Sequence, residues 1–353
     1  MKKRSSNIEL LRVISMFMVV MIHLLTKTSV LWEMNQNQAV YYISWILYGL
    51  CMTGVNCYVL ISGYFYKESE FKLKKLLSLY FQVLFYSIVI ALAAYFMQIE
   101  FKSSKRQIVF PITNREYWFV TTYLGLYCLT PYLNMAIQHL KKVQYKSLLM
   151  ILTLFFSVIP TFMNANNWLG DGGAYGIAWF IFLYLLGAYI RNYYKDGMGR
   201  KITVFYFVSV LIIPFSKFLL KNHSELLYSF NSLPALCASV FLFLTFCSIK
   251  VNNLKISNII NFFGGLTFGV YLIHNNRNIS GYLWTKLQIN FWLVEKNNIF
   301  IIILILLCVF IVCSIIEWIR QQLFKMFKIN VLTEIIAEKL EALFRKISKQ
   351  PNI

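Results

Sequence analysis

The chain has 353 residues, of which 59% are hydrophobic and only 14% are charged. A soluble protein of this composition could not cover its surface with polar groups, so an ordinary soluble enzyme is excluded. The mean hydropathy of +0.61 indicates a polytopic membrane protein. The formal net charge of +20 is also typical of nucleic-acid-binding proteins. We attribute it to membrane topology and expect no nucleic acid among the partners.

Ten apolar segments are candidates for membrane spans, because a span needs about 20 mostly apolar residues. They cover residues 8–25, 40–64, 76–98, 117–137, 147–163, 177–190, 202–219, 234–249, 262–283 and 299–318. The predicted fold is therefore all-α, a polytopic membrane bundle of about ten transmembrane helices within residues 1–318.

Basic residues gather on alternate connections between these spans. If the N-terminus is cytoplasmic, the inner connections hold Lys2, Lys3, Arg4, Lys67, Lys72, Lys74, Lys75, Lys141, Lys142, Lys146, Arg191, Lys195, Arg200, Lys201, Lys250 and Lys255. This bias fits the positive-inside rule and predicts that both termini are cytoplasmic. The external segment 98–116 is an exception, because it also holds basic residues: Lys102, Lys105, Arg106 and Arg115. Either it meets an anionic partner or one span is miscounted.

The tail, residues 319–353, is the only sizeable part outside the spans. Val331, Ile335 and Phe344 belong to a set of apolar residues that recur at helical spacing, and basic residues accompany them. The pattern predicts a basic amphipathic helix, either lying on the inner leaflet or simply solvated.

Ionisable residues inside a span are costly, so they are candidates for function. The first span holds Glu9, Arg12 and His23. Arg12 and His23 are eleven residues apart, which in a helix is three turns plus roughly 20°, so they share one face about 16 Å apart along the axis. Glu9 precedes Arg12 by three residues and can pair with it. The helix is thus predicted to carry a guanidinium near the cytoplasm and an imidazole further out.

The ninth span adds a second histidine at a similar predicted depth. His274 follows Phe262 by twelve residues, or about 18 Å. Tyr271 lies one turn earlier, and Asn275 follows directly. A run this polar cannot face lipid, so it lines a cavity or marks the outer interface. No cysteine and histidine spacing indicates a metal site, and none is expected.

Four blocks of sequence resemble the integral-membrane acyltransferase family 3, in particular its polysaccharide O-acetyltransferase branch. They are NIELLRVISMFMVVMIHL at 7–24, GVNCYVLISGYF at 54–65, YWFVTTYLGLYCLTPYLN at 117–134 and FGVYLIHN at 268–275. Arg12 and His23 match the family's signature of an arginine and a histidine separated by ten residues. In order and spacing the blocks cover nearly the whole predicted membrane domain.

The resemblance implies a membrane O-acyltransferase that takes an acetyl group from cytoplasmic acetyl-CoA. The acceptor would be a hydroxyl of an extracellular or cell-envelope polysaccharide, or of a lipid-linked glycan, at a bacterial plasma membrane. The geometry is compatible, because CoA is polyanionic and basic residues follow the second span. The residues expected to hold its phosphates are Arg12, Lys72, Lys74 and Lys75.

His23 is the expected reacting group, either as the base that deprotonates the acceptor or as a covalent relay for the acyl group. The sequence does not choose between the two. Ser62 either permits close helix packing or orients the thioester carbonyl. The residues expected to bind substrate are Glu9, Ser62, Tyr123, Tyr271, His274 and Asn275.

The alternative interpretation is a transporter or flippase of a polysaccharide or lipid-linked sugar. Ten spans with buried polar residues suit that class as well. However, the hydropathy shows no inverted repeat and no matching pair of broken spans, which are typical of transporters.

Overall fold

The computed structural model describes residues 5–28, 30–34, 38–68, 70–113, 116–163, 165, 167–194, 200–219, 225–296 and 298–348. Of the basic residues named above, five lie outside these ranges: Lys2, Lys3, Arg4, Arg115 and Lys195.

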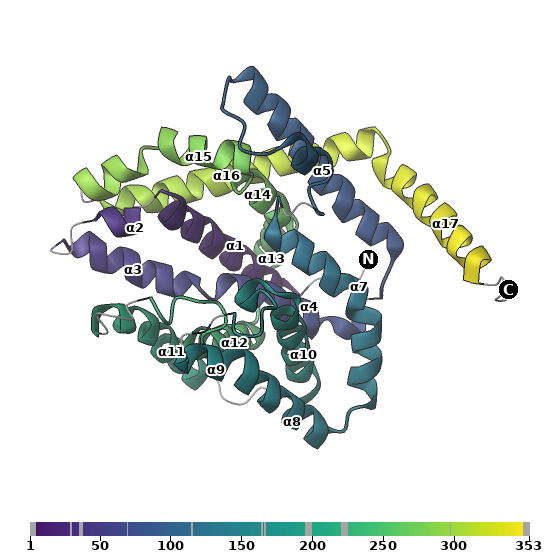
Figure 1. Ribbon diagram of the computed structural model, residues 1–353, viewed down its shortest axis with the longest axis horizontal. Helices are drawn as coiled ribbons and strands as arrows, with labels where there is room; N and C mark the ends of the chain where they lie inside the picture. The colour runs from purple at the N-terminus through teal and green to yellow at the C-terminus, as the bar shows by residue number, and fades with distance from the viewer. Residues whose placement is uncertain are drawn as a thin grey trace.

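The described chain folds into a bundle of helices (Figure 1). The helices are α1 (Ser6–Lys27), α2 (Val30–Glu33), α3 (Ala39–Cys51), α4 (Gly54–Tyr64), α5 (Leu73–Phe96), α6 (Lys105–Val109), α7 (Trp118–His139), α8 (Lys142–Thr153), α9 (Ile159–Phe162), α10 (Ile177–Tyr193), α11 (Arg200–Leu219), α12 (Leu233–Ser248), α13 (Leu254–Gly264), α14 (Thr267–His274), α15 (Arg277–Lys286), α16 (Ile299–Met326) and α17 (Ile329–Ser348). A π-helical turn, Leu154–Val158, joins α8 to α9.

Each of the ten predicted spans falls on one helix or on two or three consecutive helices, so the all-α polytopic fold is confirmed. In the described residues, seven spans are long and apolar enough to cross a membrane: Ser6–Lys27, Ala39–Tyr64, Leu73–Phe96, Lys142–Phe162, Lys201–Leu219, Leu254–His274 and Ile299–Met326. The other three predictions fall on α7, which has 22 residues, and on the shorter apolar helices α10 and α12.

The ninth span differs from its prediction of 262–283 at both ends. It begins at Leu254, because the side chain of Asn253 accepts hydrogen bonds from two backbone N–H groups of the first turn. It is interrupted between α13 and α14 and ends at His274. Asn276 then caps α15 in the same way. These side chains satisfy backbone groups that a continuous helix would pair internally. The ends of the ninth span therefore lie at positions that hydropathy alone does not predict.

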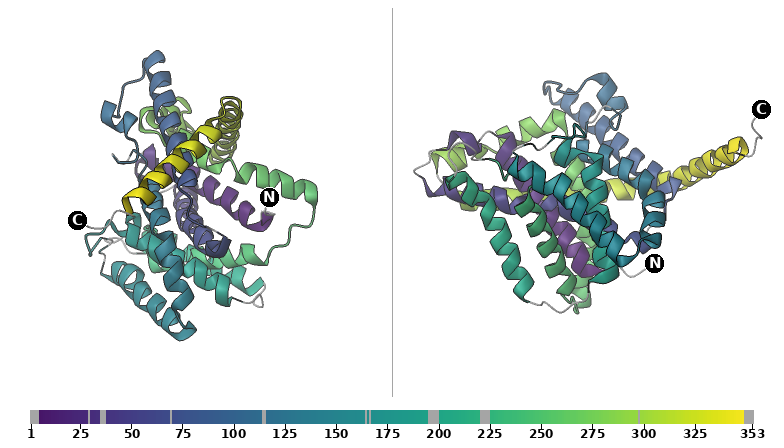
Figure 2. Two further views of the ribbon diagram at one scale, coloured as in Figure 1. Left: turned by 90° about the vertical axis from the view of Figure 1, so that its right-hand side faces the viewer. Right: turned by 60° about the horizontal axis from the view of Figure 1, so that its bottom comes forward.

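Helix α1 occupies the centre of the bundle (Figures 1 and 2). It packs against α3, α4, α12, α13, α14 and α16. In its most apolar window 61% of residues are buried, against 28% in α5 and 39% in α16. The outer helices instead expose large apolar side chains such as Leu92, Val204 and Phe300, a surface that suits lipid. The polar residues of α1 therefore lie in a protected interior.

Helices α4 and α10 pack especially closely. A Cβ at Gly63 would collide with the backbone of Tyr184, and a Cβ at Gly187 would collide with the backbone of Leu60. Small residues allow two helix backbones to approach in this way. Close helix packing, one of the two roles predicted for Ser62, is made at this point by its neighbour Gly63.

Helix α17 extends away from the bundle after α16 ends (Figure 2). Thr333 and Ala337 are buried, whereas Val331 and Phe344 are 51% and 62% exposed. An ion pair between Lys74 and Glu334, 2.8 Å long, joins α17 to α5. The predicted amphipathic helix is present, and its binding to a leaflet stays a prediction.

Candidate active site

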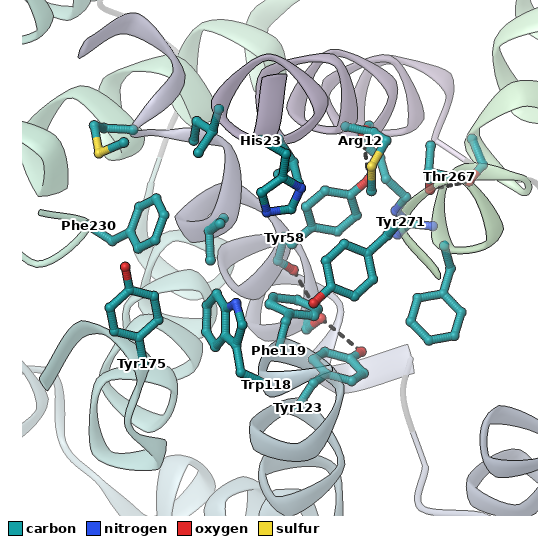
Figure 3. Close-up of a pocket in the computed structure, with 18 of the residues that line it drawn as sticks. Arg12, His23, Tyr58, Trp118, Phe119, Tyr123, Tyr175, Phe230, Thr267 and Tyr271 are labelled. Carbon is teal, nitrogen blue, oxygen red and sulfur yellow. Dashed lines mark hydrogen bonds between the residues drawn. The ribbon is translucent and has the colours of Figure 1, made fainter. Parts of the chain in front are cut away.

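A cavity of about 620 Å³ lies beside α1 in the middle of the bundle (Figure 3). One end, here called the basic end, is lined by Arg12, Lys75 and Arg320. The other, here called the aromatic end, is lined by aromatic residues: Trp32, Tyr48, Trp118, Tyr175, Tyr228 and Phe230. His23 lies between the two ends, with Arg12 on one side of it and Tyr175 on the other (Figure 3). The prediction that Arg12 and His23 share one face of their helix is confirmed.

The guanidinium of Arg12 is held by Glu9, as their spacing predicts. Arg12 Nη1 lies 3.1 Å from Glu9 Oε1 and donates to Oε2 at 3.2 Å. Glu9 is only 5% exposed, and a Cβ at Gly264 would collide with its carboxylate. Glu9 does not line the cavity, whereas Arg12 does. Glu9 therefore positions the guanidinium of Arg12 and does not itself face the cavity.

His23 and His274, which are 251 residues apart in the chain, form a direct pair. His23 Nδ1 lies 2.9 Å from His274 Nε2. His274 Nδ1 lies 2.5 Å from the carbonyl oxygen of Val270. That oxygen can only accept, so Nδ1 of His274 carries a proton. When the pair is uncharged, His274 Nε2 must then accept from His23 Nδ1, which leaves Nε2 of His23 with its lone pair.

His23 lines the cavity, whereas His274 is fully buried behind it. The fixed tautomer of His274 thus sets the tautomer of His23. This arrangement suits a base or a nucleophile, because a hydrogen bond at the far nitrogen orients the ring. The described residues contain no group of three His, Cys, Asp or Glu that could hold a metal ion.

Two further predicted residues flank the histidine pair. Tyr271 lines the cavity, with its ring centroid 6.4 Å from that of His23. Its buried hydroxyl makes no hydrogen bond of good geometry among the described residues, and its polar neighbours are Asn275 and the backbone of Phe119. Asn275 lies outside the lining, and its Oδ1 accepts from Lys27 Nζ at 2.6 Å. This contact, together with the histidine pair, fastens the outer end of α1 to α14.

Ser62 and Tyr123 are brought together at the cavity wall. Their hydroxyl oxygens are 3.1 Å apart, and Ser62 also donates to the carbonyl of Tyr58 at 3.2 Å. Both residues also line a second pocket of about 230 Å³. Arg12 and Lys75 line that pocket too, so it adjoins the basic end of the cavity.

The three lysines expected to hold phosphate lie in different surroundings. Lys75 lines both pockets, with its ammonium 5.0 Å from the ring centroid of Tyr127. Lys72 lines neither, and its side chain is 68% exposed. Lys74 also lines neither pocket, and its ammonium pairs with Glu334 of α17.

Sequence reasoning missed Glu317 and Arg320 on α16, both of which line the cavity. They are buried and paired, with Arg320 Nη2 2.7 Å from Glu317 Oε1. Their three-residue spacing repeats that of Glu9 and Arg12, and this repetition is the signal that could have found them. It was missed because the last span was taken to end at residue 318, in the middle of the pair.

The aromatic end is built from rings that pack on one another. Trp118 lies 4.7 Å from Tyr175, edge to face, and Tyr228 stacks on Tyr48 at 5.1 Å. The hydroxyl of Tyr228 donates to the carbonyl of Trp45 at 3.0 Å. Burial raises the pKa of Tyr228, so this hydroxyl keeps its proton. The aromatic end therefore carries no charge from the residues that line it.

The described part of segment 98–116, which was predicted to be external and has unexpected basic residues, folds onto α15. The backbone N–H groups of Lys102 and Ser103 donate to Asn278 Oδ1 at 3.0 and 2.9 Å. Glu116, which ends the segment, accepts from the hydroxyl of Ser103 and from the backbone of Arg277. The segment is thus fixed by the protein itself, and an anionic partner stays a prediction.

Fold and site together define a polytopic membrane protein whose cavity joins a cationic end to an uncharged end past a histidine pair. A family model described as an acyltransferase domain, acyltransferase 3, matches residues 5–318. The chain therefore belongs to the acyltransferase 3 family and is a membrane acyltransferase, as the four sequence blocks predicted. No curated protein and no solved structure matches it significantly.

Proposed function

We propose that the protein moves an acetyl group from acetyl-CoA to a hydroxyl of an extracellular or cell-envelope polysaccharide. The observation that carries this proposal is a single cavity lined by Arg12 and Lys75 at one end, His23 in the middle, and Tyr175 at the other end. CoA is a polyanion, and sugar hydroxyls are uncharged. The two ends of the cavity match these two substrates, and its volume is typical of a small-molecule site.

The donor would enter at the basic end, which the charge bias of the sequence assigns to the cytoplasm. Arg12 presents a guanidinium fixed by Glu9, and such a group is well suited to phosphate. Lys75 adds a second cation between the cavity and the smaller pocket. With the phosphates held there, the pantetheine arm would extend along the cavity and bring the thioester to His23.

In direct transfer, Nε2 of His23 takes the proton of the acceptor hydroxyl while the oxygen bonds to the thioester carbonyl carbon. The carbon–sulfur bond breaks, and the CoA thiolate takes up the proton from the imidazolium. In the relay, Nε2 itself bonds to the carbonyl carbon, the carbon–sulfur bond breaks and CoA leaves as the thiolate. The acceptor oxygen then displaces the imidazole from the acyl group, and the proton that the acceptor hydroxyl loses balances the thiolate as CoA thiol. Both routes yield an ester and CoA thiol, and both use the lone pair that the His274 contact leaves on Nε2.

The hydroxyl of Tyr271 supports the same chemistry. It is buried and makes no hydrogen bond of good geometry among the described residues, so a bound molecule that accepts its proton would complete its hydrogen bonding. Negative charge develops on the thioester carbonyl oxygen when the carbonyl carbon is attacked. A hydroxyl donating to that oxygen would stabilise the transition state.

The proposal is tested with purified protein in proteoliposomes that are given labelled acetyl-CoA and polysaccharide. Wild-type protein should transfer label, and His23→Ala should reduce the rate by about 10²–10⁴-fold. Lys339→Gln, at an exposed position on α17, is the control and should match wild type.

In cells, loss of the protein should lower the acetyl content of surface polysaccharide. Loss of polysaccharide export with an unchanged acetyl content would instead support the transporter alternative and contradict the proposal. Transfer that survives in His23→Ala would contradict the role of His23.

A further inference from the structure

We infer that Arg320 is a second phosphate-binding residue, which with Arg12 and Lys75 holds the nucleotide part of the acyl-CoA donor. This inference rests on the proposed function and deepens it. Its basis is a second arginine–glutamate pair at the basic end of the same cavity. This pair lies on α16, a helix that carries none of the four sequence blocks.

Glu317 is the most heavily hydrogen-bonded carboxylate of the described site. Besides Arg320, it accepts from the hydroxyl of Tyr86 at 2.7 Å, from Gln321 Nε2 at 2.9 Å and from Gln82 Nε2 at 3.3 Å. These neutral donors stabilise the carboxylate in a position that is 1% exposed. The charge of Glu317 is therefore compensated by more than one group.

Arg320 is oriented by that carboxylate through two parallel bonds. Its Nε donates to Glu317 Oε2 at 2.9 Å, and its Nη2 donates to Oε1 at 2.7 Å. This two-point contact fixes the plane of the guanidinium. Among the described residues, Nη1 makes no hydrogen bond or ion pair, so its two N–H groups remain as donors toward a ligand in the cavity that Arg320 lines.

The two arginine–glutamate pairs both pack against the ninth span, which is interrupted between α13 and α14. A Cβ at Gly264 would collide with Glu9, and a Cβ at Gly269 would collide with Glu317. Each glutamate thus packs against a glycine of α13 or α14, and each directs its arginine to the cavity. The basic end carries three cations, Arg12, Lys75 and Arg320, against the two carboxylates that hold the arginines, so its balance is positive.

This spacing of cations suits a ligand with more than one phosphate group. CoA carries a diphosphate and a separate 3′-phosphate, so a single guanidinium would leave part of its charge without a partner. A structural role for Arg320, in which it only neutralises Glu317, makes a different prediction. It would stabilise the fold without affecting which donor is used.

The test compares two donors, acetyl-CoA and acetyl-pantetheine, which shares the thioester but lacks the nucleotide. In Arg320→Gln, we expect KM for acetyl-CoA to rise by about 10-fold to 100-fold, because a charged hydrogen bond to phosphate is lost. The kcat with acetyl-CoA and all parameters with acetyl-pantetheine should change little. Lys325→Gln removes an exposed charge from the same helix and should behave as wild type.

Because Arg320→Gln leaves a buried carboxylate without its main partner, it could fail to fold. The double variant Glu317→Gln/Arg320→Gln removes both charges together. If the single variant does not fold, the kinetics of the double variant are measured in its place. Arg320→Lys keeps the charge but not the two-point geometry, so its KM for acetyl-CoA should lie between those of wild type and Arg320→Gln.

Thermal unfolding in detergent gives a readout that does not depend on transfer. CoA should stabilise wild-type protein more than pantetheine does, and this difference should be lost in the Arg320 variants. Suppose that CoA stabilises wild type more than pantetheine does, and stabilises the folded Arg320 variants more by the same margin. The inference about Arg320 is then overturned, while the proposed function stands. If wild type shows neither CoA stabilisation nor acetyl transfer, the proposed function fails.

Discussion

At the basic end of the cavity, Arg12 and Arg320 are each held by a buried glutamate three residues earlier in the chain. At the aromatic end, Tyr175 is held by ring contacts with Trp118 and Phe230. The basic end is therefore held together by ion pairs between buried charges, and the aromatic end by packing between uncharged rings.

The difference follows from the cost of burying charge. A buried ion pair must be complete, because removing one partner leaves a charge with no compensation. An aromatic ring gives contact area and edge-to-face packing, and each contact contributes about 0.5–1.5 kcal/mol. Changes at the basic end should therefore be large and specific to the donor, whereas changes at the aromatic end should be small and specific to the acceptor.

Of the changes that separate the two ends, the largest effect is expected from Arg12→Gln. Loss of a charged hydrogen bond to phosphate, worth about 1.5–3 kcal/mol, should reduce kcat/KM for acetyl-CoA by about 10-fold to 150-fold. The KM for the polysaccharide should stay within twofold of wild type. Steady-state kinetics with each substrate varied in turn measures both, and Arg12→Lys is the control that keeps the charge. An equal change in both KM values would contradict the assignment of the donor to the basic end and the acceptor to the aromatic end.

His274→Leu tests the group that lies between the ends. It leaves Nδ1 of His23 without its acceptor, which should cost about 1–3 kcal/mol, or roughly 5-fold to 150-fold in kcat with either donor. His274→Gln offers an amide oxygen in its place and should recover much of the rate. If the Gln and Leu variants are equally slow while both fold normally, the hydrogen bond does not set the tautomer of His23.

Gly63→Ala tests the close packing of α10 against α4, the helix that carries the cavity residue Ser62. The added methyl group would meet the backbone of Tyr184, which cannot move aside as a side chain can, so the change should cost about 1–3 kcal/mol of stability. A lower midpoint of thermal unfolding in detergent would show it. Gly125→Ala is the matched control, because its methyl group would meet only the end of the Ile177 side chain, at 2.9 Å. Equal losses in both variants would contradict the close α4–α10 contact.

The smallest effect is expected from Tyr175→Ala at the aromatic end. Tyr175 is 51% exposed, so its removal should disturb the fold little and reduce acceptor binding by about 1 kcal/mol, or roughly fivefold in KM. Tyr175→Phe keeps the ring and should resemble wild type. A change in the KM for acetyl-CoA, with no change for the polysaccharide, would show that the aromatic end does not bind the acceptor.

Local patterns in the sequence predicted a good part of this site. The eleven-residue interval between Arg12 and His23 placed both on the cavity face of α1, and the three-residue interval between Glu9 and Arg12 predicted their ion pair. Both predictions hold because they depend only on the geometry of a single helix. The four blocks that resemble family 3 likewise predicted the family, and the match over residues 5–318 confirms it.

Contacts between distant helices could not be read in this way. The partner of His23 lies 251 residues further along the chain, and no helical period connects the two. Lys74 looked as available as Lys75, but Glu334 of α17 forms an ion pair with it. The caps that divide the ninth span also went unrecognised, because an apolar run hides the short polar signals at its ends.

The sequence alone determined that this chain is an all-α membrane bundle and that its first helix carries a guanidinium and an imidazole on one face. Hydropathy and helical periodicity are local properties, so they survive whatever the helices pack against. Only the tertiary structure decided which charges remain at the cavity and which imidazole nitrogen keeps its lone pair. Those outcomes depend on groups from separate helices meeting within hydrogen-bond distance in a buried interior, where an unpartnered polar group is costly.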